Sequence, residues 1–162
     1  MQTIFNTDER EATIFFSTIY EADVTTVWNC YTNPDLLSQW WMPKPWNFEL
    51  ISQNFAPEGQ LLYAAVGPDG EKNYSGQTYN EINQNRSISL SNYFTDESGN
   101  TNHELPVADW LIGFTGVEQG TKLTVNIHFK NAEDLNKTLA MGFKEGFTQT
   151  AEQLRTILTE SN

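Results

Sequence analysis

Cationic, metal-binding and redox-active side chains are scarce in this sequence. Its 162 residues contain nine lysines and arginines against 21 acids, giving a net charge of −12, and include two histidines and one cysteine. Because a polyanion of this size repels phosphate groups, we expect neither nucleic-acid binding nor attachment to an anionic membrane. The single cysteine allows no internal disulfide bond.

Long apolar runs are also missing. No segment approaches the roughly 20 apolar residues that span a bilayer, and the polar residues 1–11 do not resemble a secretory signal peptide. We therefore expect a cytoplasmic protein. Residues 1–10 are expected to form a flexible N-terminal arm and residues 11–160 a single domain, a usual size for one hydrophobic core.

Motifs of catalysis and cofactor binding are absent as well. The sequence has no G-x-S-x-G, no Walker loop and no G-x-G-x-x-G. His103 and His128 occupy polar positions and are expected to face solvent, and Cys30 is expected to be a buried structural thiol. We predict no catalytic residue, no metal site and no cofactor.

Two acids precede a strand that contains Trp110. Asp109 is the better candidate for an inward-facing acid because its neighbours are apolar, and Glu104 is the second. A capping or turn role is the favoured interpretation for both.

The order of the expected elements follows from the apolar pattern. Residues 13–20 predict a strand, and two short helices follow over residues 26–31 and 36–41. Short apolar runs separated by turn signals then extend over residues 46–129, which is typical of an antiparallel meander. Its last strand, residues 122–129, alternates between apolar and polar side chains, so one face of the sheet should be buried.

A long helix is expected over residues 131–158. Its apolar side chains recur every three or four residues and form one stripe, comprising Leu135, Leu139, Phe143, Phe147, Ala151, Leu154 and Leu158. Gly142 and Gly146 lie at an edge of this stripe, although each costs about 1 kcal/mol relative to alanine in a helix. Close packing on the sheet and space for a ligand are both open explanations.

Several segments together resemble the START-like (SRPBCC, helix-grip) superfamily, in the branch of the activator of heat-shock protein 90 ATPase. The matching segments are Tyr20-Glu21-Ala22-Asp23 with Val27-Trp28, Thr32 to Pro43 (TNPDLLSQWWMP), Pro68-Asp69-Gly70 with Gly76, Gly120-Thr121-Lys122-Leu123, and Gly142-Phe143 with Gly146-Phe147. The resemblance spans about residues 12–158. Asp23 stands where the family usually has proline, and Gln60 where a second glycine is common.

The resemblance implies an α+β helix-grip fold. A curved antiparallel sheet of about seven strands would surround the long C-terminal helix, with two short helices after the first strand. Folds of this type often enclose a cavity, and the element order derived from the residues is the same.

Aromatic residues make up 13% of the chain, and six of them are candidates for lining a ligand cavity: Trp41, Phe48, Tyr63, Trp110, Phe143 and Phe147. An unfilled void of roughly 300 Å³ would cost about 7 kcal/mol, comparable to a domain's whole stability. We therefore expect a modest pocket that binds a small apolar or aromatic molecule.

Two alternative functions stay open. The first is a pocket-shaping enzyme similar to the polyketide cyclases and aromatases of the superfamily, which would need an inward polar group such as Asp109 or Tyr63. The second is a chaperone-related protein-interaction module, for which an exposed apolar patch would be the sign. The sequence does not decide whether the protein forms a homodimer.

Overall fold

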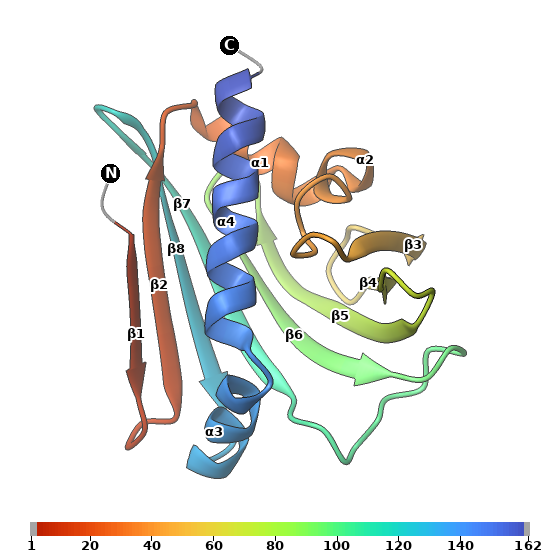
Figure 1. The fold of residues 1–162 in the computed structure, drawn as a ribbon. Helices are drawn as coiled ribbons and strands as arrows, with labels where there is room; N and C mark the ends of the chain where they lie inside the picture. The colour runs from red at the N-terminus through yellow and green to blue at the C-terminus, as the bar shows by residue number, and fades with distance from the viewer. Residues whose placement is uncertain (1–2, 161–162) are drawn as a thin grey trace.

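A single eight-stranded antiparallel sheet dominates the computed structural model, which describes residues 3–160. The strand order is β1-β2-β8-β7-β6-β5-β4-β3, so every neighbour along the chain from β3 to β8 is also a neighbour in the sheet. The sheet curves around the C-terminal helix (Figure 1). The strands are β1 (Ile4–Asp8), β2 (Thr13–Tyr20), β3 (Asn47–Gln53), β4 (Gln60–Val66), β5 (Lys72–Asn83), β6 (Ser87–Thr95), β7 (Ala108–Val117) and β8 (Gly120–Phe129).

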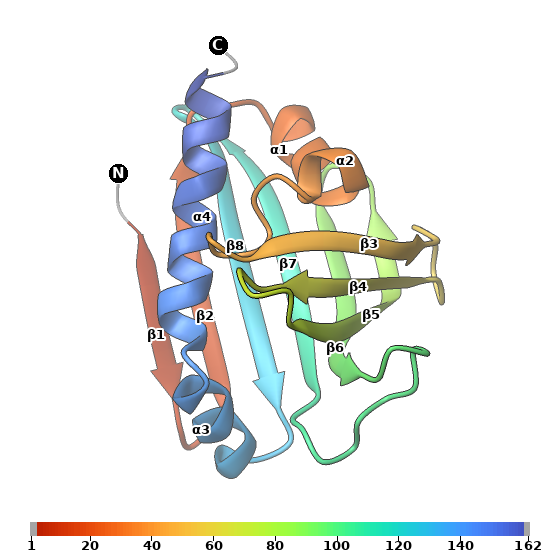
Figure 2. The same cartoon turned by 45° about the vertical axis from the view of Figure 1, so that its right-hand side comes forward.

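Four helices accompany the sheet: α1 (Val24–Thr32), α2 (Pro34–Leu37), α3 (Ala132–Ala140) and α4 (Phe143–Glu160). Helix α4 crosses the concave face of the sheet, and α1 and α2 lie beside its C-terminal half (Figures 1 and 2). The Asp23 side chain caps α1 by accepting a hydrogen bond from the Thr26 amide at 2.8 Å. Asp23 thus starts this helix by capping it. The α+β helix-grip fold expected from the sequence is confirmed.

The concave face of the sheet carries the hydrophobic core. In β8, Leu123, Val125, Ile127 and Phe129 are buried, whereas Lys122 and His128 on the opposite face are exposed, as the alternation predicted. The stripe of α4 packs against this face through Ala151, Leu154 and Leu158. Apolar side chains from the two layers therefore meet in one core, the arrangement that removes the largest apolar area from water.

Strand β1 is an addition to the expected fold. Residues 4–8, assigned to a flexible arm from their polar composition, pair with β2 in an antiparallel ladder from Ile4↔Ser17 to Asp8↔Thr13. The backbone hydrogen bonds to β2 stabilise this strand, although the pattern of its side chains does not predict one. This raises the number of strands from about seven to eight; residues 1 and 2 of the expected arm lie outside the described residues.

The long helix expected over residues 131–158 is in fact two helices. Helix α3 ends at Ala140, and α4 begins at Phe143 after a break in which Gly142 has a φ of +86°. Only glycine adopts this left-handed conformation without strain, so Gly142 ends one helix instead of weakening the middle of another. Gly146, by contrast, lies within α4.

The short helix α2 also differs from its expected bounds. It ends at Leu37, so Trp40 and Trp41 lie in the turn that follows it, not on the helix. The turn still buries both indole rings. Among residues 3–160, no helix combines the length and the apolar character needed to cross a membrane.

Candidate functional site

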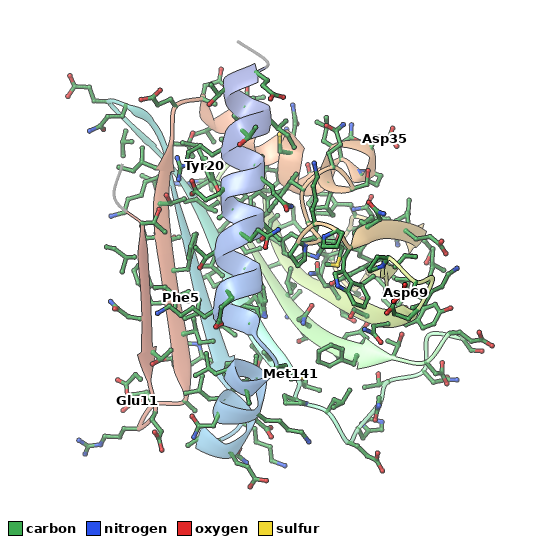
Figure 3. The ribbon with its side chains drawn as sticks, viewed as in Figure 1. Phe5, Glu11, Tyr20, Asp35, Asp69 and Met141 are labelled. Carbon is green, nitrogen blue, oxygen red and sulfur yellow. The ribbon has the colours of Figure 1, made fainter. Side chains whose placement is uncertain are left out.

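A cavity of about 400 Å³ lies between the N-terminal half of α4 and the concave face of the sheet. Five strands (β4 to β8) contribute to its walls, together with α3, α4 and the segment that connects α2 to β3. Its lining residues are Trp41, Met42, Pro43, Trp46, Tyr63, Ala65, Asn73, Ser75, Asn92, Phe94, Pro106, Ala108, Trp110, Ile127, Phe129, Thr138, Met141, Gly142, Phe143, Gly146, Phe147 and Thr150. Met141 is 49% exposed, and it lies at the junction of α3 and α4 (Figure 3).

Five of the six aromatic residues proposed from the sequence line this one cavity: Trp41, Tyr63, Trp110, Phe143 and Phe147. Phe48 does not line it. Its ring stacks on that of Tyr63, with centroids 4.8 Å apart and planes 20° apart, so it supports the cavity wall from the adjacent strand. The structure thus gathers the candidates in space, and a ligand-binding role for them stays a prediction.

The aromatic wall is a connected set of rings. Phe143 stacks on Phe147 at 5.2 Å between centroids, and the edge of Trp110 meets both rings at 6.0 and 5.7 Å. The ring centroid of Trp41 lies 6.1 Å from that of Trp110 and extends this set of rings. These offset and edge-on contacts are the favourable ones for aromatic pairs. They hold the rings in place while leaving faces and edges open to the cavity.

Opposite this wall, the cavity has a polar side that was not predicted from the sequence. Asn73 and Ser75 come from β5, and Asn92 comes from β6. Residues 73, 75 and 77 of β5 are all polar and lie on the same face of the strand, because side chains alternate along it. On the β4 side these polar residues face Ala65, Tyr63 and Leu61, and their alternation is the signal that could have identified the polar side.

Tyr63 connects the two sides. The Nε1 of Trp41 donates a hydrogen bond to the Tyr63 hydroxyl at 3.1 Å, and Ser75 lies directly opposite Tyr63 in the β4–β5 ladder. Burial raises the pKa of Tyr63, although the hydrogen bond from Trp41 and the neighbouring Ser75 side chain act in the other direction. The hydroxyl therefore stays protonated at neutral pH, and it remains available as a donor and acceptor.

The segment that carries Trp41, Met42 and Pro43 is held against α4 by two glutamine side chains, mainly that of Gln153. The Gln153 amide nitrogen donates to the carbonyl oxygens of Trp40 at 3.0 Å and Met42 at 2.8 Å, and its oxygen accepts from the Lys44 amide at 2.9 Å. Gln149 adds a bond to the Lys44 carbonyl oxygen at 3.0 Å. These contacts fix one edge of the cavity.

The structure places the acidic and histidine candidates away from the cavity. Asp109, the proposed inward acid, lies on the outer face of β7, where its carboxylate accepts a hydrogen bond from Ser91 at 2.9 Å. The alternation of β7 turns Trp110 inward and therefore Asp109 outward. Glu104, His103 and His128 are exposed.

Cys30 is buried, as expected for a structural thiol, and burial raises its pKa. A raised pKa lowers the fraction of reactive thiolate at neutral pH. Among the described residues, no three histidine, cysteine or acidic side chains gather as ligands for a metal ion.

The chemistry of the cavity follows from this lining. Among the described residues that surround it there is no Asp, Glu, Lys, Arg or His. Rings and aliphatic groups can cover an apolar ligand, while Tyr63, Ser75 and the two asparagines can hydrogen-bond to an uncharged polar group. A charged group would be buried there without an ionic partner, which is unfavourable.

Comparison with protein families gives one assignment. The family model described as Activator of Hsp90 ATPase homolog 1-like protein matches residues 21–159. This match includes every cavity-lining residue. No curated protein matches the chain.

Solved structures give the same fold. A crystal structure of a protein from Mycobacterium smegmatis is 28% identical, with 97% of each chain covered and a TM-score of 0.89. A solution structure of a protein from Arthrobacter aurescens is 27% identical, with 97% of this chain and 91% of that chain covered and a TM-score of 0.91. A crystal structure of a Nitrosomonas europaea protein, 22% identical with a TM-score of 0.81, covers 93% of this chain and 96% of its own and shares the fold.

Proposed function

The chain belongs to the family of Activator of Hsp90 ATPase homolog 1-like proteins, and we propose that it binds a small, predominantly apolar molecule in the cavity between α4 and the sheet. The observation that carries this proposal is the cavity itself. About 400 Å³ of space lies beside a connected set of aromatic rings. A dry and sealed void of that size would lower the free energy of unfolding by several kcal/mol. A pocket of this size that has a fixed aromatic wall is therefore better explained by a ligand that occupies it.

The size and lining of the cavity define the ligand further. Cavities of roughly 300–1,000 Å³ suit small molecules, which places this one at the lower end of that range. The aromatic wall favours flat or ring-containing compounds over long chains. The expected ligand is therefore a small apolar or aromatic molecule. The net charge of −12 disfavours nucleic-acid and anionic-membrane partners, and a cytoplasmic location remains part of the proposal.

A titration with the neutral fluorescent probe N-phenylnaphthylamine tests this function. We expect a saturable rise in emission with one site per chain, because the probe would leave water for the aromatic wall. The blocking variant is Gly146→Leu, since Gly146 lines the cavity and a longer side chain there would occupy its space. Thr156→Leu, on an exposed face of the same helix, is the matched control.

The outcomes separate clearly. Saturable binding that Gly146→Leu abolishes and Thr156→Leu preserves supports the cavity as the site. Emission that rises without saturation, or saturable binding that Gly146→Leu leaves unchanged, contradicts the proposal.

A protein-interaction role is the second candidate, and an observation at the sheet edge favours it. Strand β3 is an edge strand whose Leu50 and Ile51 are 41% and 45% exposed. Edge strands with apolar side chains can accept a further strand from a partner. If β3 recruits a partner, the double variant Leu50→Lys/Ile51→Lys should abolish that association and leave probe binding intact.

A further inference from the structure

Three of the hydrogen-bonding side chains that line the cavity lie next to one another in space. Trp41, Tyr63 and Ser75 follow one another from the aromatic side to the polar side, and all three line the cavity. Each is largely buried, with 8%, 5% and 9% of its surface exposed. A buried hydrogen-bonding group without a partner costs about 1–3 kcal/mol, so the way in which these groups pair is informative.

Counting donors along this series leaves one proton unused. The indole nitrogen of Trp41 can only donate, so its bond to the Tyr63 hydroxyl does not use the proton of Tyr63. Tyr63 and Ser75 then have two hydroxyl protons between them, and a bond between these neighbouring hydroxyls can use at most one of the two. Among the described residues, no other side chain or backbone group forms a hydrogen bond that accepts the second proton.

The location of this unused donor is favourable for a ligand. Both hydroxyl-bearing side chains line the cavity, and whichever of the two retains the free proton can donate to a molecule placed there. Because the indole donates to the Tyr63 hydroxyl, it polarises that group and strengthens it as a donor in turn. Burial raises the pKa of Tyr63, so the phenol keeps its proton at neutral pH.

We propose that the Tyr63–Ser75 hydroxyl pair donates a hydrogen bond to the carbonyl oxygen of a neutral ligand whose remaining surface is apolar. A carbonyl oxygen accepts without needing to donate, which matches an unused proton. The lack of any charged side chain in the described lining disfavours carboxylates, since they would be buried without a cation. This inference rests on the proposed function, and it specifies the class of molecule that the cavity binds.

A matched pair of ligands tests the acceptor. Acetylnaphthalene and isopropenylnaphthalene have nearly the same shape, but the second replaces the carbonyl oxygen by a methylene group. Each would displace N-phenylnaphthylamine from the wild-type chain, and naphthoate would serve as the charged comparison. We expect the ketone to bind about three- to tenfold more tightly than the hydrocarbon, the effect of one net hydrogen bond, and more tightly than naphthoate.

The double variant Tyr63→Phe/Ser75→Ala removes both hydroxyls. We expect it to bind the two neutral compounds equally, while isopropenylnaphthalene retains its wild-type affinity. Tyr79→Phe is the matched control, because Tyr79 is a buried tyrosine on the adjacent strand whose hydroxyl accepts from Gln53 and which does not line the cavity. It should keep the preference for the ketone.

The carbonyl stretching frequency of bound acetylnaphthalene provides a measurement on the wild-type chain, should the double variant fail to fold. A shift to lower frequency than in an alkane supports the hydrogen bond, and an unshifted band overturns it. Equal wild-type affinities for ketone and hydrocarbon, or naphthoate binding as tightly as the ketone, overturn this inference while the proposed function stands. If none of the compounds binds, the proposed function itself fails.

Discussion

The two halves of α4 contact the same sheet with opposite results. In the C-terminal half, Ala151, Leu154 and Leu158 are buried, and the Tyr20 hydroxyl donates to the Ala151 carbonyl oxygen at 3.0 Å. In the N-terminal half, Phe143 is only partly buried, and the same helix borders a cavity. The C-terminal half of α4, which we call the closed half, therefore packs closely in the core, whereas the N-terminal half borders the cavity.

The difference is explained by what surrounds each half. Beside the C-terminal half, α1 and the turn after α2 supply a dense group of rings, in which the ring centroid of Tyr31 lies 4.7 Å from that of Trp40 and 5.5 Å from that of Phe114. Beside the N-terminal half, the helix has just begun after the break at Gly142, and Gly146 has no side chain to fill the space. Close packing gives stability, and the missing side chains leave room for binding.

Truncating a side chain in each half should give the largest contrast. Leu154→Ala would leave a void in the closed half, where Leu154 is fully buried, and should lower the free energy of unfolding by about 2–5 kcal/mol. Phe143→Ala should cost less, because its ring is partly exposed beside an existing cavity. Urea unfolding of both variants measures the difference. Equal losses would mean that the two halves do not differ in packing.

High pH should weaken the closed half through its buried phenols. Burial raises the pKa values of Tyr20 and Tyr31 in the folded chain. Since the unfolded value is about 10, the stability from these neutral phenols is complete below pH 10 and is lost as the pH rises through the folded values. We expect phenolate absorbance of these tyrosines and loss of the circular-dichroism signal to appear in one transition.

Tyr20→Phe tests the cause of that transition. At neutral pH the variant should be about 1 kcal/mol less stable, because the hydrogen bond to the Ala151 carbonyl oxygen is lost. Above pH 10 its free energy of unfolding should fall less steeply than that of the wild type. An identical slope in the two proteins would show that Tyr20 does not contribute to the alkaline transition.

The cavity edge should depend on Gln153. Gln153→Ala removes the contacts that fasten residues 40–44 to α4, and should cost about 1–3 kcal/mol, since backbone groups lose their partners. Gln149→Ala, four residues earlier on the exposed side, should cost clearly less. Amide exchange at Lys44, together with urea unfolding, measures both effects. Unchanged exchange in Gln153→Ala would contradict a fastening role.

Much of the hydrophobic core could be predicted from the sequence. The alternation in residues 122–129 and the stripe of Ala151, Leu154 and Leu158 are periodic patterns. Such patterns predict the structure well because each apolar face must be buried. Strand β1 could not be found in this way. Its pairing with β2 depends on backbone hydrogen bonds, which leave no pattern in the side chains.

The cavity was predictable only in part. Large rings identified five of its lining residues, but Phe48 supports the wall from behind, and Asp109 lies on the outer face. The polar side formed by Asn73, Ser75 and Asn92 depends on which strands are neighbours and on which face their side chains lie. These relations come from the sheet register and not from any local stretch of sequence.

The two glycines near the start of α4 give the smallest and most specific test, because the sequence treats them as equivalent and the structure does not. Gly142 has a φ of +86°, so Gly142→Ala should destabilise the chain by about 1 kcal/mol despite the open space around it. Gly146 is helical, and an added Cβ would meet Pro43 at an ordinary 3.7 Å. Gly146→Ala should therefore stabilise the chain by about 0.5–1 kcal/mol through helix propensity. Thermal and urea unfolding of the two variants should shift in opposite directions. A Gly142→Ala variant as stable as the wild type would mean that the break between α3 and α4 does not depend on Gly142.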